Sequence, residues 1–189
     1  MPIVHTGDEQ ARLKALRELS IVGTERLPEF DALVQAAATV FDCPIALVSL
    51  IEEKEQWFKA CHGLDIDGTE RSISFCQHAI LSETVLVVPD ALADDRFRDN
   101  PLVTGEPHIR FYAGCPLSID GHRRLGTLCV IDRTPRVPTE TQLEQLHRLA
   151  TAVEGLIKSH KHRLEAEEAT KLAEHHKDIA TREFDLLEE

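Results

Sequence analysis

Apolar and polar residues recur with two different periods along this chain, and these periods separate the helices that we expect from the strands. Leucines at helical spacing predict a first helix over residues 8–19, with Asp8 as its N-cap. Pro28 suits the first turn of a second helix, which the same spacing extends to Phe41. Short runs of apolar residues predict strands over 45–51 and 56–61, joined by a turn.

The middle of the chain predicts a compact block of strands and loops. We expect a loop over 63–69, a short helix over 72–81, a short strand over 85–88 and a polar loop over 91–108. Two apolar runs, 111–119 and 125–131, follow and are joined by turn residues at 120–123, so they predict an antiparallel hairpin. A central strand with apolar residues on both faces needs material above and below it. Such a covered sheet is a natural place for a pocket.

From Pro138 onward the residues are helix formers, which predict one long helix reaching Glu189. A helix of roughly 50 residues would extend about 75 Å, which is more than a domain of this size covers, so its far half is expected to need a partner helix. Because the chain ends without a helix-stopping residue, we expect the helix to continue beyond it. Apolar positions at steps of three and four form a coiled-coil seam of Leu143, Leu146, Ala150, Val153, Ile157, His160 and Leu164. The register slips by one residue after Leu164 and resumes at Leu172, Ile179 and Leu186.

Length and charge narrow the class of protein. A chain of 189 residues is long enough for one domain plus an extension. A formal net charge of −12 argues against sequence-independent nucleic-acid binding, which needs clustered Lys and Arg. The sequence contains neither a membrane-length apolar run nor a signal pattern at its start, so we expect no membrane contact and a cytoplasmic location.

The five cysteines stand singly among apolar residues, and the simplest interpretation is a set of reduced, buried side chains: Cys43, Cys61, Cys76, Cys115 and Cys129. A redox-sensing or ligand-contacting role for Cys76 is the alternative. No Cys-x-x-Cys pair is present, so no metal site is expected. Ser72, Ser74 and Ser82 have no His at a spacing typical of nucleophilic catalysis, so no catalytic residue is assigned and the chain is not expected to be an enzyme.

The polar and aromatic residues of the middle block supply the candidate binding site. Arg110 opens a buried strand and Asp90 closes another, so an ion pair between Arg110 and an aspartate is the simplest expectation, with ligand recognition by the same guanidinium as the alternative. Cys76 and His78 lie two residues apart on a predicted helix, so they point in different directions. The candidate pocket residues are Trp57, Phe75, Cys76, His78, Asp90, Arg96, Phe97, Arg110, Phe111, Tyr112 and Cys129.

The order of these elements, together with a set of short motifs, resembles the GAF domain of bacterial signal-transduction sensors of the histidine kinase or diguanylate cyclase type. The motifs, which lie within residues 10–160, are Phe75-Cys76-Gln77-His78-Ala79-Ile80, Val88-Pro89-Asp90-Ala91, Asp95-Arg96-Phe97, Asn100-Pro101, Ile109-Arg110-Phe111-Tyr112-Ala113-Gly114, Pro116-Leu117 and Gly126-Thr127-Leu128-Cys129-Val130. The resemblance implies an α+β fold, with a GAF-like antiparallel sheet, helices on both faces and a long C-terminal coiled-coil helix.

The same resemblance implies a sensory module that binds a small ligand or senses redox state. Residues 1–160 would form the sensory domain, and residues 161–189 would form a signalling helix that dimerises and leads to a kinase, cyclase, phosphodiesterase or PAS domain. The Asn-Lys-Phe-Asp-Glu motif of cyclic-nucleotide-binding members and the Asp-Ile-Pro motif of phytochromes are absent, so neither cGMP nor a tetrapyrrole is assigned and the cofactor is unknown. Two alternatives stay open: a ligand-free dimerisation module with a collapsed pocket, and an enzyme like free-methionine-sulfoxide reductase, which would need two cysteines to converge.

Overall fold

The computed structural model describes the backbone of residues 2–187 and the side chains of residues 2–177 and 179. Its centre is one antiparallel sheet with the strand order β3-β2-β1-β6-β5-β4. Strands β1 and β6 lie in the middle because both are apolar on both faces. The strands are β1 (Ile45–Ile51), β2 (Glu55–His62), β3 (Gly68–Glu70), β4 (Leu86–Val88), β5 (Phe111–Ser118) and β6 (Arg124–Asp132).

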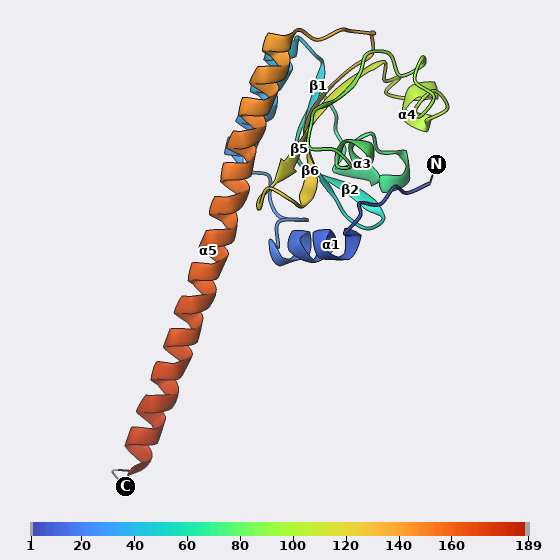
Figure 1. Cartoon of the computed structure of the whole chain (residues 1–189). Helices are drawn as coiled ribbons and strands as arrows, with labels where there is room; N and C mark the ends of the chain where they lie inside the picture. The colour runs from blue at the N-terminus through green and yellow to red at the C-terminus, as the bar shows by residue number, and fades with distance from the viewer. Residues whose placement is uncertain (1, 188–189) are drawn as a thin grey trace.

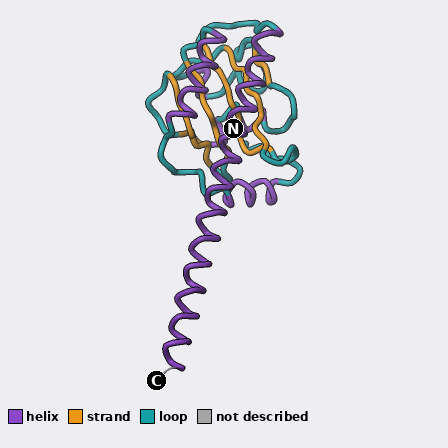
Figure 2. Tube along the Cα trace, turned by 90° about the vertical axis from the view of Figure 1, so that its left-hand side faces the viewer, coloured by secondary structure: helices purple, strands orange, loops and turns teal. Residues whose placement is uncertain are grey.

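Helices cover both faces of the sheet, as expected for the α+β class (Figure 1). Helices α2 and α5 pack on one face, while α3 and α4 lie with the loops over the other, and α1 lies near one end of the sheet. Seen at a right angle, α5 continues well past the domain as a single projecting helix (Figure 2). The helices are α1 (Glu9–Glu18), α2 (Pro28–Phe41), α3 (Cys76–Ala79), α4 (Pro101–Thr104) and α5 (Glu140–Leu187), with a 3-10 turn at Arg71–Ile73.

The two sides of the sheet form two separate hydrophobic cores, because side chains alternate between faces along each strand. On the helical face, Val48 and Val130 of the central strands pack against Phe30 and Phe41 of α2 and against the buried side of α5. We call this side the helical face. On the other face, Leu47 and Ile131 belong to a second cluster with α3 and the loop before β5. We call this side the cavity face.

Most predicted elements are confirmed, and the errors fall in short segments. The predicted helix over 72–81 is wrong: the chain forms a 3-10 turn and then the one-turn helix α3, separated by an extended Ser74. The Ser74 hydroxyl donates to the side chain of Gln56, a long-range bond that local helical spacing does not reveal. The predicted loop over 63–69 contains the start of the short edge strand β3, and the loop over 91–108 contains α4, capped by Asn100.

Helix α5 has two different halves. The first residues of the predicted seam are buried against α2, β5 and β6 of the same chain, so this half packs on its own domain. Near the end of this half, the ring of His160 forms a hydrogen bond of 3.0 Å with the carbonyl of Leu19. Beyond this point the side chains of Leu172 and Ile179 are 56% and 40% exposed. Leu186 lies outside the residues whose side chains are described.

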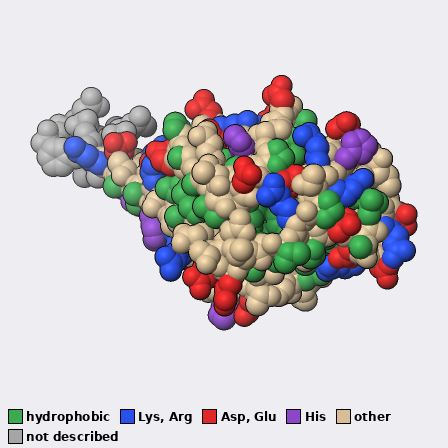
Figure 3. Space-filling view, turned by 90° about the horizontal axis from the view of Figure 1, so that it is seen from above, with side chains coloured by type: hydrophobic (Ala, Val, Ile, Leu, Met, Phe, Trp, Pro, Cys, Tyr) green, Lys and Arg blue, Asp and Glu red, His purple; other side chains and the backbone are tan. Residues whose placement is uncertain are grey.

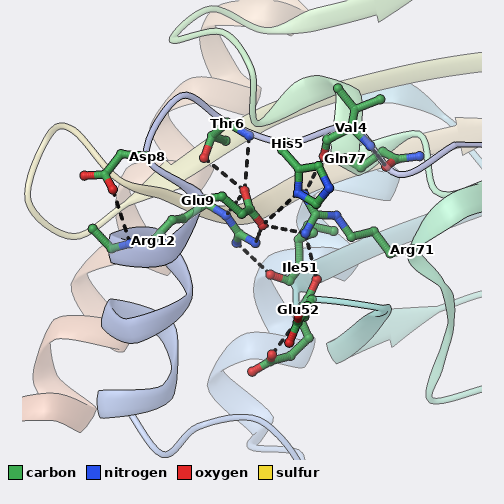
Figure 4. A network of polar contacts seen from close by, with 12 residues as sticks. Val4, His5, Thr6, Asp8, Glu9, Arg12, Ile51, Glu52, Arg71 and Gln77 are labelled. Atoms are coloured by element: carbon green, nitrogen blue, oxygen red, sulfur yellow. Dashed lines mark hydrogen bonds and ion pairs between the residues drawn. The ribbon is translucent and has the colours of Figure 1, made fainter.

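A charged cluster fixes the N-terminal segment to the domain (Figure 4). The carboxylate of Glu9 on α1 accepts hydrogen bonds from Arg12 and Arg71, each with a shortest distance of 2.6 Å. Arg12 also donates to the Ile51 carbonyl at the end of β1, and Arg71 donates to the Val4 carbonyl. Burial opposes ionisation of Glu9, but the bonds from the two arginines outweigh it and hold the pKa of this carboxyl well below its usual value.

Candidate functional site

A cavity of about 290 Å³ opens on the cavity face, between the sheet, α3 and the segment that contains α4. Strands β1, β2, β5 and β6 supply its floor, and residues 64–69 and 102–109 supply much of its wall. Most of the lining is apolar, and this is typical of sites that bury a small molecule. The lining residues are Leu47, Gln56, Phe58, Leu64, Ile66, Thr69, Phe75, Cys76, Leu102, Glu106, Pro107, Ile109, Tyr112, Ile131 and Arg133.

One side of the cavity carries a connected group of neutral polar side chains. The side-chain oxygen of Gln56 accepts hydrogen bonds from Ser49 at 2.9 Å and Ser74 at 2.7 Å. The Gln56 amide nitrogen donates to the Thr69 hydroxyl at 3.1 Å. These bonds satisfy the buried Gln56 side chain and hold it at the lining, so the polar contribution of the cavity wall is fixed in position.

Beside this group lies a pair of buried thiols. The sulfur atoms of Cys76 on α3 and Cys129 on β6 are 3.9 Å apart. The Tyr112 hydroxyl donates to the Cys76 sulfur at 3.3 Å. Gly114 makes this arrangement possible, because a Cβ at that position would lie 2.1 Å from the Tyr112 hydroxyl oxygen. All three polar groups are buried, but Cys76 also lines the cavity.

The five thiols differ in their tendency to ionise. Burial raises the pKa of Cys43 and Cys115 to about 12, and it also raises the pKa of Cys61. Burial opposes ionisation of Cys76 as well, but hydrogen bonds from Cys129 and Tyr112 are among those that outweigh it, so the pKa of Cys76 falls below its ordinary value. The pKa of Cys129 is raised well above its ordinary value, since it is fully buried and adjoins Cys76. The surroundings therefore favour the thiolate at Cys76 over the thiolate at Cys129.

The structure brings six of the predicted pocket residues together on the cavity face. Phe75, Cys76 and Tyr112 line the cavity itself. Phe97 stacks on Phe75 with ring centres 4.1 Å apart, and His78 meets the Phe97 ring edge-on at 4.9 Å. The sixth residue, Cys129, lies behind Cys76. Burial, followed by the nearby charge of Arg96, lowers the pKa of His78.

Two of the predicted pocket residues lie on the opposite side of the sheet. Phe111 packs on the helical face, where its ring lies 6.3 Å from that of Phe41. Trp57 packs against the same core, and the Lys59 ammonium lies 5.7 Å from its ring centre. The expectation that Trp57 and Phe111 line the pocket is therefore wrong for this cavity. Both are aromatic residues of the sheet, and the face on which each lies decides whether it reaches the cavity.

The charged candidates lie outside the cavity. The expected ion pair of Arg110 with an aspartate is wrong, because its guanidinium donates to the carbonyls of Val103 and Ile109, each at 3.0 Å. Arg96 pairs instead with Asp94, which it meets at 2.6 Å. Asp90 accepts a hydrogen bond from the backbone of Leu92 and closes a local turn. These contacts fold the polar loop onto itself and leave none of the three candidates at the cavity.

Sequence reasoning missed the polar residues that do reach the cavity. Gln56 directly precedes Trp57 and Phe58 in β2, and a neutral polar residue at this place is the signal that the sequence offers. Glu106 and Arg133 are exposed lining residues, and Arg133 donates to the Pro107 carbonyl at 3.0 Å. Their convergence depends on the fold of the loop before β5, which the sequence pattern does not specify.

Within the described part of the chain, no group of three or more His, Cys, Asp and Glu side chains is arranged to hold a metal ion. None of the described helices combines the length and the apolar character needed to cross a bilayer. Acidic and basic side chains are interspersed on the surface seen from above (Figure 3).

Most of the chain matches a known domain family. A family model described as the GAF domain matches residues 25–157. The chain belongs to the GAF domain family. A cyclic di-GMP phosphodiesterase from Pseudomonas aeruginosa is 46% identical over 147 residues, which are 77% of this chain and 25% of that protein. The chain thus spans about a quarter of the length of this relative.

Solved structures with low sequence identity share the fold. The GAF domain of an Acinetobacter phosphoenolpyruvate-protein phosphotransferase has a TM-score of 0.60 at 19% identity, covering 84% of this chain and 96% of its own. A free methionine-R-sulfoxide reductase from Neisseria meningitidis, solved with its substrate, has a TM-score of 0.59 at 18% identity, with coverage of 86% and 98%. The PixJ GAF domain of Thermosynechococcus elongatus has a TM-score of 0.58 at 16% identity, with coverage of 90% and 98%.

Proposed function

We propose that this chain is the sensory GAF module of a cyclic di-GMP signalling protein, and that it takes a small, largely apolar molecule into the cavity described above. The observation that carries the proposal is the 46% identity to a cyclic di-GMP phosphodiesterase, of which the matched part is a quarter. In this proposal the chain itself is regulatory and non-catalytic, and the output activity belongs to another domain. A ligand that binds two arrangements of the domain unequally would shift their populations.

The cavity supports a ligand with an apolar body. Aromatic and aliphatic side chains dominate the lining, and Gln56 and Thr69 offer neutral hydrogen-bonding groups. Charged side chains in the lining are confined to Glu106 and Arg133, which are exposed. An open cavity of this size does not favour the alternative of a collapsed pocket. Its apolar lining also disfavours a zwitterionic free amino acid, so it argues against the sulfoxide reductase alternative despite the convergence of two cysteines.

Helix α5 supports a relay from the domain to an output. Leu146, Val153 and Ile157 are buried on the helical face, so a change in the sheet would move the first half of the helix. The contact at His160 is followed closely by the register slip after Leu164, which we propose as the site of helix rotation or unwinding. In this proposal residues 1–160 are the sensory unit and residues 161–189 the signalling helix.

The exposed part of α5 supports a homodimer. Leu172 and Ile179 are seven residues apart, a heptad spacing that places them on one side of the helix, and both are exposed. We expect sedimentation to show a dimer that weakens in Leu172→Glu, with the charge change Lys171→Glu at the adjacent exposed position as control. If both variants dimerise as strongly as the unchanged chain, dimerisation through Leu172 and Ile179 is contradicted.

Ligand binding is tested by thermal unfolding of the full chain with a panel of small aromatic and aliphatic compounds. A compound at about 100 times its dissociation constant stabilises the native state by about 2.7 kcal/mol, so the melting temperature should rise. The variant Leu102→Trp narrows the cavity and should lose this rise, while Val137→Trp at an exposed position away from it should keep it. A panel without any stabilising compound, or a rise that persists in Leu102→Trp, would contradict binding in the cavity.

A further inference from the structure

The pair formed by Cys76 and Cys129 is the feature of the cavity face that ligand binding leaves unexplained. The two sulfur atoms lie 3.9 Å apart, and both side chains are buried. Cys76 lines the cavity, whereas Cys129 lies behind it in the middle of β6 and is not part of the lining. A molecule inside the cavity would therefore meet the sulfur of Cys76 before that of Cys129.

The other three cysteines have different surroundings. Cys43 and Cys115 belong to the core of the helical face, on the far side of the sheet. Cys61 packs at the margin of the cavity-face core, and its thiol donates to the Leu64 carbonyl at 3.2 Å. Neither Cys43, Cys61 nor Cys115 lines the cavity. Cys76 is therefore the cysteine that a molecule in the cavity can reach, and Cys129 is the cysteine next to it.

The environment of Cys76 also favours its reactive form. Thiolates, rather than thiols, attack electrophilic oxygen and sulfur. The Tyr112 hydroxyl points its proton at the Cys76 sulfur, which stabilises negative charge there. The Thr127 hydroxyl is buried beside the pair, where it favours negative charge on the sulfur of Cys76 and on that of Cys129. Thr127 and Cys129 both belong to β6 and share its cavity side, because they are two residues apart.

We propose that Cys76 and Cys129 are a modification site for lipophilic organic hydroperoxides, which oxidise the pair to a disulfide. The proposal rests on the proposed function only in that the cavity admits small apolar molecules. The Cys76 thiolate attacks the terminal oxygen of the hydroperoxide, the O–O bond breaks, and the alkoxide leaves as an alcohol with the proton that the thiol has lost. Cys76 is then a sulfenic acid. The Cys129 sulfur attacks it, the S–S bond forms, the S–O bond breaks, and water leaves with the Cys129 proton. Two thiols are oxidised by two electrons while one peroxide bond is reduced.

Bond formation would change the wall of the cavity. A disulfide brings its sulfur atoms to about 2.05 Å, so the pair must approach by about 2 Å. Strand β6 is hydrogen-bonded to β1 and β5 on both sides, whereas α3 is a single turn between loops. The shift therefore falls mainly on α3, which carries Cys76 and follows Phe75 directly. Both residues line the cavity, so oxidation would alter the space that a ligand occupies.

The experiment uses the reduced full chain, treated with cumene hydroperoxide or with hydrogen peroxide, alkylated, and digested for mass spectrometry without reduction. We expect a pair of peptides cross-linked through Cys76 and Cys129, and dithiothreitol should separate them. The cross-link should form severalfold faster with cumene hydroperoxide than with hydrogen peroxide. Dimedone should label Cys76 in Cys129→Ser, where the sulfenic acid has no partner. The control Cys115→Ser should cross-link like the unchanged chain. Trapping with dimedone in the unchanged chain at early times provides the same evidence if Cys129→Ser does not fold.

The remaining outcomes decide between this inference and the proposed function. The absence of the Cys76–Cys129 cross-link, or equal labelling of Cys43 and Cys115, would overturn the inference. A rate with cumene hydroperoxide that is unchanged in Leu102→Trp would overturn the cavity as the route of entry. Stabilising compounds without cross-linking would remove the thiol chemistry and leave ligand binding in place. If the cross-link forms but no compound stabilises the chain, the thiol site is supported and reversible binding of a small molecule is contradicted.

Discussion

The two faces of the sheet are built from the same strands but differ in how completely they are filled. On the helical face, α2 and α5 pack long apolar side chains onto β1, β5 and β6. On the cavity face, two very short helices and irregular loops leave a cavity of about 290 Å³ with polar groups beside it. The comparison shows that the long helices α2 and α5 fill one face of the sheet, whereas the short helices and loops leave space for a small molecule on the other.

The charged cluster at Glu9 belongs to neither face, and it shows how polar groups are buried when their role is structural. The Glu9 carboxylate accepts hydrogen bonds from both arginines, whereas the Cys76 thiol contacts the Tyr112 hydroxyl and the Cys129 sulfur. The cluster thus joins groups of opposite charge, whereas the contacts of the two thiols are with uncharged groups.

The largest expected effect comes from breaking this charged cluster. Removing Glu9 by Glu9→Ala leaves Arg12 and Arg71 buried without their shared carboxylate, and breaking a buried pair in this way costs about 3–5 kcal/mol. The control Glu18→Ala in the same helix removes an exposed pair with Lys14, for which about 0–1 kcal/mol is expected. Urea unfolding measures both, and equal costs would show that the cluster contributes nothing to stability.

The next effect tests the helical face. Leu146→Ala removes a fully buried side chain of α5 and should cost about 2–5 kcal/mol in the free energy of unfolding. The same substitution at Leu172, which is exposed on the projecting half of the same helix, should change the monomer's stability by less than about 0.5 kcal/mol. Denaturant unfolding at low protein concentration makes the comparison. A small loss in Leu146→Ala would mean that α5 does not anchor to the domain.

The contribution of Glu9 to stability should depend on pH. The pKa of Glu9 in the folded chain lies well below its ordinary value of 4.5, so its contribution to stability is fully present above about pH 4.5 and is lost as the pH falls below that value. Unfolding free energies between pH 6 and roughly pH 3 should fall more steeply for the unchanged chain than for Glu9→Gln, which lacks this ionisation. Parallel profiles would contradict the assignment of the acid-sensitive group.

The sequence pattern predicts the long elements well because their evidence is local. Phe30, Val34 and Phe41 follow the helical period of α2, and the heptad positions of α5 identify its buried side through Ile157. The interruption at Ser74 escaped prediction, because a bond to Gln56 in a distant strand decides it.

The candidate site is predicted only in part, for a related reason. The motif around Phe75 and Cys76 does lead to the cavity, and so does Tyr112. Trp57 and Phe111 are equally aromatic, but strand register turns them to the helical face. Arg110 meets carbonyl groups of its own loop, and such contacts depend on loop geometry that no periodic pattern encodes.

The most direct test of the difference between the faces is one substitution made twice on the same strand. Leu47 and Leu50 of β1 are both buried, but Leu47 lines the cavity while Leu50 packs on the helical face. Leu50→Phe adds volume to a filled core and should cost about 1–3 kcal/mol, whereas Leu47→Phe can extend into the cavity and should cost less than about 1 kcal/mol. Urea unfolding of the two variants gives both values. Equal losses, or a larger loss for Leu47→Phe, would contradict an account in which one face is filled and the other is open.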